Sequence, residues 1–334
     1  MRAIVQDRYG SPDGLRLREV EPPTAGDDEV LVRVRAASVH PDVWHVVRGS
    51  PYVLRLMGSG LRRPRPRIPG TDLAGVVEAV GRGVRDFRPG DEVFGESRLG
   101  FSWRNGGTFA EYATAPASAL AHKPANVTFE QAATVPTTGY IALLNLPAAR
   151  LRPGRRVLVN GAAGGVGALA VQIAKAHGAH VTGVEHTTKL ALVRSLGADD
   201  VLDYTSEDFT RGDARYDVIM DIPGNRPVAA CRRVLAPGGA YVLIGHDQFG
   251  RTGHRWLGSL PRFAKLGVQS LFVPELRRAE PAPSKPDSMA RLRAHLEAGE
   301  LTPIVDRTFP LAEAGAAVRY LATGDAVGRI VLTV

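Results

Sequence analysis

A glycine cluster between an apolar strand and an apolar helix is the segment of this chain best suited to hold a ligand. The sequence predicts the strand over 157–160 and the helix over 166–177. Glycine lets the backbone approach a phosphate closely, and the first turn of a helix offers unpaired N–H groups with a partial positive charge. We therefore expect a dinucleotide to rest its pyrophosphate on the backbone of Gly164, Gly165, Val166 and Gly167.

The surroundings of the cluster strengthen this expectation. Ala162 stands where the dinucleotide fingerprint usually has its first glycine, so the strict motif is missed by one methyl group. A glycine turn alone is weak evidence, and a turn without a ligand is the alternative. A turn that follows a buried strand and precedes a helix and a second strand is much more specific.

The residue that ends the second strand usually selects between NAD and NADP. Here it is Glu185, whose carboxylate suits ribose hydroxyls and repels a 2′-phosphate. The next residues favour the phosphate, because hydroxyls donate hydrogen bonds to it and an ammonium neutralises it. We expect NADP(H), with NAD(H) as the alternative, and predict that the adenosine end contacts Glu185, Thr187, Thr188, Lys189 and Tyr204.

Two regions with different sequence patterns carry these residues. Residues 1–122 carry short β-branched runs broken by Gly and Pro, which is typical of a small barrel-like β domain. From residue 123 strands and helices alternate, which predicts a parallel sheet. We expect strands over 157–160, 180–184, 201–203, 217–221 and 240–244, and helices over 166–177, 188–196, 226–235 and 288–298. The last run, 328–334, is placed to close the first sheet.

Bulk composition narrows the class of protein. A chain of 334 residues is longer than one hydrophobic core usually supports, so the length predicts two domains. Cys231 is the sole cysteine, and neither a signal-peptide pattern nor an apolar run of membrane-spanning length is present. We expect a cytoplasmic protein without stable membrane insertion. The net charge of +8 comes from dispersed arginines. This spread disfavours nucleic acid as a partner.

Several motifs, in this order, resemble the medium-chain dehydrogenase/reductase superfamily, closest to its zinc-free quinone oxidoreductase-like branch. They lie at 37–42, 67–77, 87–94, 107–112, in the glycine turn and at 196–199. The resemblance implies an α/β fold, with a GroES-like β-barrel catalytic domain at 1–122 completed by 299–334. It also implies a Rossmann doubly wound parallel sheet at 123–298, a cofactor between the two domains, and a homodimer.

Zinc members of this superfamily hold a catalytic metal with thiolates and imidazole. Motif alignment places Ser38, Thr71, Asp72 and about Thr134 at those positions, and these residues would not hold zinc tightly. His40 and His45 are poorly spaced for one helix face. We expect no metal site.

The family's active-site loop matches 38–45, with His40 where asparagine is more usual. We predict that His40 donates a hydrogen bond or a proton to the substrate, with a His that only satisfies the loop backbone as the alternative. Asp42 orients His40 or contacts the cofactor ribose. Tyr52 lines the substrate side or packs. The resemblance places cofactor contacts at Thr137 or Thr138, at Ile244 and Gly245, and at His246, which is either a contact or a surface residue.

Without a Lewis acid, a conjugated acceptor is the easier substrate, because the negative charge spreads into an enolate or phenolate. The resemblance implies NADPH-dependent reduction of a small apolar quinone or α,β-unsaturated carbonyl compound. The alternatives are a zinc-free alcohol dehydrogenase and a cofactor-binding protein without turnover. A basic, apolar insert at 251–278 forms a lid, touches a membrane surface, or serves as an interface or loop cover.

Overall fold

A five-stranded parallel sheet forms the core of the unit that contains the glycine cluster. The computed structural model describes residues 1–98, 106–146, 151–245, 255–276 and 282–334. Every pairing in this sheet is parallel, and the order across it is β10, β9, β8, β11, β12. These strands are β8 (Arg156–Asn160), β9 (His180–Glu185), β10 (Asp200–Asp203), β11 (Tyr216–Asp221) and β12 (Leu235–Leu243). The order confirms the expected doubly wound fold, whose switch point lies between β8 and β11.

Both faces of this sheet are buried, which explains its continuous apolar runs. Val157 and Val159 of β8 point into one core cluster, and Leu158 between them points into another on the opposite face. α4 (Gly165–Ala176) packs into the first cluster. Phe263 and Leu266 of α7 pack against the second. The remaining helices of this unit are α5 (Leu190–Ser195) and α6 (Val228–Arg233).

The second large sheet has seven strands and is mostly antiparallel. Its order is β13, β14, β3, β4, β5, β7, with β6 also paired to β3. The strands are β3 (Glu29–Val39), β4 (Asp72–Val80), β5 (Glu92–Glu96), β6 (Tyr112–Pro116), β7 (Leu120–His122), β13 (Val305–Pro310) and β14 (Arg329–Thr333). β14 pairs antiparallel with β3, so the last residues complete the sheet built by the first. This is the GroES-like unit, and its presence confirms the expected fold class.

Smaller elements surround this sheet. β1 (Arg2–Val5) and β2 (Arg16–Glu19) form an antiparallel pair. α1 (Pro41–Arg48) follows β3 directly, and α9 (Ala314–Leu321) lies between β13 and β14 in the chain. Both helices contribute to the core of the antiparallel unit, with Val43, Trp44 and Val47 from α1 and Ala314, Ala317 and Val318 from α9.

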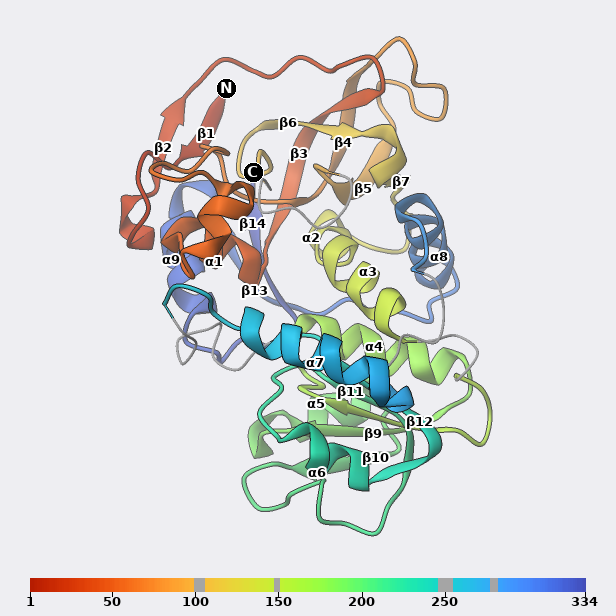
Figure 1. Cartoon of the computed structure of the whole chain (residues 1–334). Helices are drawn as coiled ribbons and strands as arrows, with labels where there is room; N and C mark the ends of the chain where they lie inside the picture. The colour runs from red at the N-terminus through yellow and green to blue at the C-terminus, as the bar shows by residue number, and fades with distance from the viewer. Residues whose placement is uncertain (99–105, 147–150, 246–254, 277–281) are drawn as a thin grey trace.

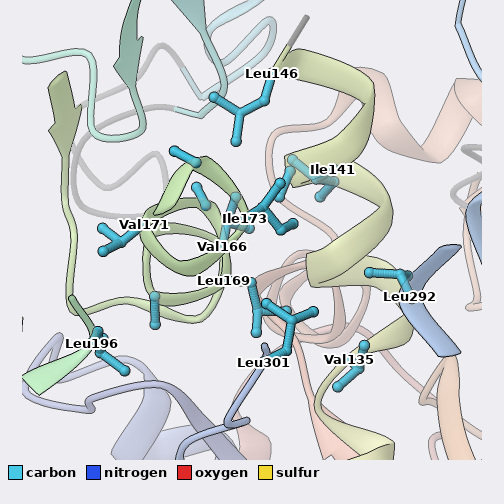
Figure 2. Close-up of a cluster of buried hydrophobic side chains, with 14 of the residues drawn as sticks. Val135, Ile141, Leu146, Val166, Leu169, Val171, Ile173, Leu196, Leu292 and Leu301 are labelled. Carbon is cyan, nitrogen blue, oxygen red and sulfur yellow. The ribbon is translucent and has the colours of Figure 1, made fainter. Parts of the chain in front are cut away.

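Three helices fill the junction between the sheets (Figure 1). They are α2 (Phe129–Ala133), α3 (Pro136–Asn145) and α8 (Lys285–Glu297). Figure 2 shows Ile141 of α3, Val166 and Leu169 of α4 and Leu292 of α8 in one buried cluster. A Cβ atom on Gly139 would lie 2.4 Å from the Leu292 side chain, so this glycine allows α3 to pack closely on α8. The junction is therefore a continuous core.

Two expected boundaries were wrong, for local reasons. The helix expected over 226–235 is shorter, because Pro227 takes the N-cap position in an extended conformation. The strand expected over 240–244 begins at Leu235, and its pairing with β11 shifts register between Tyr216 and Val218. A search of the described residues finds no helix long and apolar enough to cross a membrane.

Candidate functional site

The glycine turn joins the end of β8 to the start of α4. Gly164 is the N-cap of α4, and the N–H of Ala168 donates to its carbonyl at 2.8 Å, the first hydrogen bond of the helix. The N–H groups of Gly165, Val166 and Gly167 therefore lie in the first turn, where a helix supplies no acceptor. Three adjacent donors at the positive end of a helix suit an anion.

Gly167 and Gly164 have different structural roles in the turn. A Cβ atom on Gly167 would lie 2.0 Å from the carbonyl oxygen of Gly161, so only glycine fits there. A Cβ atom on Gly164 would meet only one atom, that same oxygen at 3.6 Å. Gly164 therefore borders open space within the turn. The space fits a pyrophosphate that approaches the backbone directly.

Arg329 lies over the same turn and was not anticipated from the sequence. Its guanidinium is so close to Gly165 that a Cβ atom there would lie 2.4 Å from Nε. The residue is buried, and its Nε has no hydrogen-bond partner. Burial lowers the pKa of Arg329 to about 10, and Asp72 and Asp42 oppose this shift. Within the described part of the chain this cation forms no ion pair, which makes it a strong candidate to hold a phosphate.

The residues predicted to contact the adenosine lie at and after the carboxyl end of β9. The carboxylate of Glu185 accepts hydrogen bonds from the N–H of Ala163 at 3.2 Å and from the N–H of His186 at 2.9 Å. The Lys189 Nζ donates to the carbonyl of Ala326 at 3.2 Å and lies 3.4 Å from that of Gly324. The structure thus brings Glu185 to the glycine turn and Lys189 to the loop that precedes Gly328 and Arg329.

The other residues predicted for this end lie nearby. The Thr187 hydroxyl donates to the carboxylate of Asp203, and the Thr188 N–H donates to His186 Nδ1 at 3.3 Å. The exposed ring of Tyr204 lies 5.8 Å from the His186 ring, measured between centroids. Thr187 is therefore engaged with a carboxylate, which competes with its predicted contact to a 2′-phosphate.

A buried polar cluster fixes the loops at the switch point. Asp221, at the end of β11, accepts hydrogen bonds from Asn160 Nδ2 at 2.8 Å and from the Tyr241 hydroxyl at 2.8 Å. The N–H of Ile244 donates to the Asp221 carbonyl at 3.0 Å, so Ile244 and Gly245 follow β12 at this edge. His246 lies outside the described residues, and its predicted contact stays a prediction.

His40 is the N-cap of α1, where its Nδ1 accepts the N–H of Asp42 at 3.2 Å. Because Nδ1 is the acceptor, the neutral ring carries its proton on Nε2 and presents that N–H as a donor. The Asp42 carboxylate is 3.4 Å from Nδ1, an ion pair for the protonated ring. Burial acts to raise the pKa of Asp42, but His40, His45 and Arg329 outweigh it, and the pKa lies below its usual value.

Asp72 is the buried centre of the site. Its oxygens accept hydrogen bonds from the Ser38 hydroxyl at 2.9 Å and the Thr137 hydroxyl at 2.5 Å. Burial raises the pKa of Asp72, against the opposing influence of His40, Thr137, Ser38 and Arg329. Both hydroxyl protons are therefore committed to the carboxylate. Ser38, Asp72 and Thr137 offer one carboxylate and two hydroxyls, a donor set that zinc does not favour. The described residues contain no group of three or more His, Cys, Asp or Glu side chains that could hold a metal ion.

The structure separates Thr137 from Thr138. Thr138 is fully buried, and its hydroxyl donates to the backbone carbonyls of Thr134 and Val135, which immediately precede α3. Its side chain is thus turned towards the backbone, and its predicted contact with the cofactor stays a prediction. Thr137, one position earlier, is the residue joined to Asp72.

Glu96 and Lys285 form a buried ion pair beside Asp72. The Lys285 Nζ is 2.5 Å from a Glu96 oxygen and 3.6 Å from the centroid of the Tyr140 ring. Asp72 and Glu96 are direct partners on β4 and β5. Burial and the negative charge of Asp72 raise the pKa of Glu96 from 4.5 to about 7, although Lys285 opposes this.

Because of this pair, we expect the folding stability of the protein to depend on pH. Because the folded pKa of Glu96 exceeds the unfolded value, its contribution is full below about pH 4.5 and is lost as the pH rises through about 7. Glu96→Gln is expected to remove a decline on the order of 1–3 kcal/mol in unfolding free energy between pH 5 and 7. Urea unfolding of both proteins across this range measures the difference. Parallel curves would contradict the assignment.

Tyr52 is placed by its packing. Its ring stands edge-on to Trp256 with centroids 5.1 Å apart, and the guanidinium groups of Arg55 and Arg255 lie over its faces at 4.5 and 4.9 Å. These contacts favour the packing alternative. A role for Tyr52 on the substrate side stays a prediction.

Sequence reasoning missed three members of the cluster, Arg329, Glu96 and Lys285, and considered Asp72 only as a failed zinc ligand. The missed signal in the sequence was charge within otherwise apolar strands, as in Arg329 at the start of β14 and Glu96 at the end of β5. A charged residue in a buried strand needs a partner or a ligand.

Comparison with known proteins agrees with this geometry. A family profile described as the alcohol dehydrogenase GroES-like domain matches residues 26–125, and one described as zinc-binding dehydrogenase matches residues 196–332. The chain is 33% identical over 339 residues to a chloroplastic NADPH-dependent alkenal/one oxidoreductase of Arabidopsis thaliana. It is 32% identical over 341 residues to a 2-methylene-furan-3-one reductase of Solanum lycopersicum. Each alignment covers 99% of this chain and 79% of the relative.

A comparison with a solved structure agrees with these sequence matches. The quinone oxidoreductase from Coxiella burnetii superposes with a TM-score of 0.82 at 28% identity, covering 100% of this chain and 99% of that one. The chain belongs to the medium-chain dehydrogenase/reductase superfamily and is an oxidoreductase of its quinone oxidoreductase-like branch. The resemblance found in the sequence motifs is thereby confirmed.

Proposed function

We propose that this protein uses NADPH to reduce the conjugated double bond of a small apolar α,β-unsaturated carbonyl compound, or a quinone. The observation that carries the proposal is the buried Arg329 over the glycine turn, which forms no ion pair within the described residues and interacts electrostatically with Asp72 and Asp42. It sets an anion site next to hydrogen-bond donors and a carboxylate that already binds two hydroxyls. The names of the relatives support the choice of acceptor.

The residues of the chain have separable tasks in this reaction. NADPH, when bound, supplies the hydride that adds to the β-carbon of the acceptor. Arg329 and the first-turn N–H groups of α4 bind the pyrophosphate. The His40 Nε2–H donates to the carbonyl oxygen as it gains enolate charge, and a solvent proton then completes the α-carbon. One such donor contributes about 3–4 kcal/mol to the stabilisation of the charge.

Asp72 and Thr137 act as a fixed support in this scheme. The short hydrogen bond between them ties the start of α3 to β4. This bond fixes the position of the beginning of α3 relative to β4. Orientation of the reactants is the advantage, since a displacement of about 1 Å in a reacting group costs on the order of a hundredfold in rate.

A direct assay tests the proposal. NADPH oxidation, followed at 340 nm, is measured with an open-chain enone, with 1,4-naphthoquinone and with the saturated ketone that matches the enone. We expect turnover with one or both conjugated acceptors and little with the saturated ketone. Turnover confined to the saturated ketone would establish an alcohol dehydrogenase instead. Cofactor binding without turnover on any acceptor would indicate a binding protein.

Lys189 is expected to decide the cofactor preference. In Lys189→Ala the ammonium that neutralises a 2′-phosphate is gone, so the Kd of NADPH should rise about tenfold while that of NADH changes little. Fluorescence titration with each cofactor measures the ratio. The Lys175→Ala variant, which loses an ion pair with Asp199 elsewhere, serves as the control. If the affinities for NADPH and NADH fell equally, the only role left to Lys189 would be to hold the 324–326 loop in place.

The finer features follow from the same proposal. We propose that the protein is a homodimer, that it acts in the cytoplasm and that it does not need zinc. We also propose that nucleic acid is not a partner and that the domain boundaries lie near residues 122 and 298. The side chains at the family's zinc positions support zinc independence, since the Ser38 and Thr137 hydroxyls both donate to the Asp72 carboxylate. Metal analysis of the active protein, together with turnover in the presence of a chelator, tests this point.

A further inference from the structure

Exposed hydrophobic side chains are concentrated in one region of the molecule. Eleven large hydrophobic residues are exposed among the described residues, and nine of them fall in two segments, 55–65 and 255–272. The most exposed in each are Leu56 at 76% and Phe272 at 80%. The two exceptions are Leu17 and Tyr204. A scattered exposed leucine needs no explanation, but a concentration of this kind does.

The two segments meet in space, although some 200 residues separate them in the sequence. The N–H of Tyr52 donates to the carbonyl of Arg255 at 3.0 Å, and the N–H of Val53 donates to that of Trp256 at 2.9 Å. A Cβ atom on Gly258 would lie 2.5 Å from Pro51. These contacts place the start of each segment side by side. We call residues 55–65 together with 255–272 the docking face.

α7 presents two different apolar sides. Phe263 and Leu266 pack against the core cluster on the outer face of the parallel sheet. Leu260, Val268 and Leu271 recur at helical spacing on the adjoining side of the helix and are exposed. Figure 1 shows α7 lying along the front of the molecule, near the junction of the two units. The exposed stripe therefore extends the docking face along a helix.

The docking face is also free of acidic residues. No Asp or Glu occurs between Asp42 and Asp72 or between Asp247 and Glu275, whereas the first interval alone contains six arginines. Arg62, Arg63 and Arg65 are exposed and form no ion pair within the described part of the chain. Lys265 adds an exposed ammonium on α7. The face is thus both apolar and strongly cationic.

We propose that the docking face binds the surface of an anionic phospholipid membrane. Apolar side chains flanked by arginine and lysine match the layered chemistry of such a surface, where acyl chains lie below phosphate headgroups. A second copy of the chain fits poorly, because a symmetric contact would bring two sets of unpaired arginines together. Nucleic acid would satisfy the arginines but leave the exposed leucines, Val268 and Phe272 in water.

Vesicle sedimentation of the whole protein tests the proposal. The probes are vesicles of phosphatidylcholine alone and vesicles of phosphatidylcholine with 30% phosphatidylglycerol. We expect at least tenfold tighter binding to the anionic vesicles, weakened by 0.5 M NaCl. A charge variant (Arg62→Gln, Arg63→Gln, Arg65→Gln) and an apolar variant (Leu56→Ser, Val268→Ser, Phe272→Ser) should each lose most of this binding while retaining wild-type thermal stability.

Matched controls make the result specific. Arg85→Gln, Arg194→Gln and Arg233→Gln remove the same charge from exposed arginines elsewhere, and Leu17→Ser removes an exposed leucine. Both controls should bind anionic vesicles as the wild type does. Equal loss in the control triple would reduce the effect to net charge and overturn the proposal. The proposal would also be overturned if the wild type failed to bind anionic vesicles. It would be overturned as well if the protein were a dimer that the apolar variant converts to a monomer.

Discussion

Replacing Gly167 with alanine is expected to destabilise the protein and abolish NADPH binding together. The new methyl group would lie 2.0 Å from the carbonyl oxygen of Gly161 and 2.9 Å from Cα of Ala162, and both are backbone atoms. The turn must therefore move. We expect a loss of about 3 kcal/mol or more in unfolding free energy, near the upper end of overpacking costs. Urea unfolding without cofactor and fluorescence titration with NADPH measure the two effects.

Gly164→Ala is the matched control, and it separates folding from binding. Its methyl group has space, and the residue has φ −74° and ψ 168°, which any residue adopts. Its only structural cost is a weaker N-cap, at most about 1 kcal/mol. The same methyl group would occupy the approach of the pyrophosphate, so the Kd of NADPH should rise at least tenfold. An unchanged Kd would show that the phosphates bind elsewhere.

Replacing His40 with alanine is expected to lower kcat about a hundredfold while the Kd of NADPH stays within about twofold. The change removes the Nε2–H donor and also the cap that His40 Nδ1 provides to the N–H of Asp42. His40→Asn keeps a donor and a cap, and we expect it to retain most of the activity. Stopped-flow turnover with a conjugated acceptor, at saturating cofactor, measures kcat for each variant.

The pair also distinguishes the two roles proposed for His40. If the ring only donates a hydrogen bond, the pH profile of kcat is the same for the wild type and for His40→Asn. If His40 supplies the proton, the titration disappears in His40→Asn. An alanine variant with wild-type kcat and only a modest loss of stability would leave His40 with the capping role alone.

Local signals were enough to predict the parallel unit. The strands from β8 to β11 and the start of α4 follow from apolar runs with glycine punctuation, and the structure places them within a residue or two of the expected bounds. The capping box of Thr128 and Gln131, which opens α2, is likewise a pattern of near neighbours. Such features depend on neighbours along the chain, which a sequence pattern records.

The polar centre of the site could not be predicted in this way. Lys285 meets Glu96 across 189 residues, and Arg329 reaches Gly165 only because β14 pairs with β3 and because Gly328 bonds to Ala163. No local pattern carries these contacts. Thr137 and Thr138 were equivalent in the sequence, and only the helix that contains them decides which hydroxyl faces Asp72.

The hydrogen bond from the Gly328 N–H to the Ala163 carbonyl, 2.7 Å long, has a practical consequence for protein engineering. It joins the residue just before β14 in one unit to the glycine turn of the other, and Arg329 follows directly. A chimera that exchanges only residues 123–298 with a relative would combine the relative's glycine turn with Arg329 of this chain, and so divide the proposed nucleotide site between two proteins. Modular recombination in this chain should therefore move residues 324–329 with the parallel unit, as one cassette.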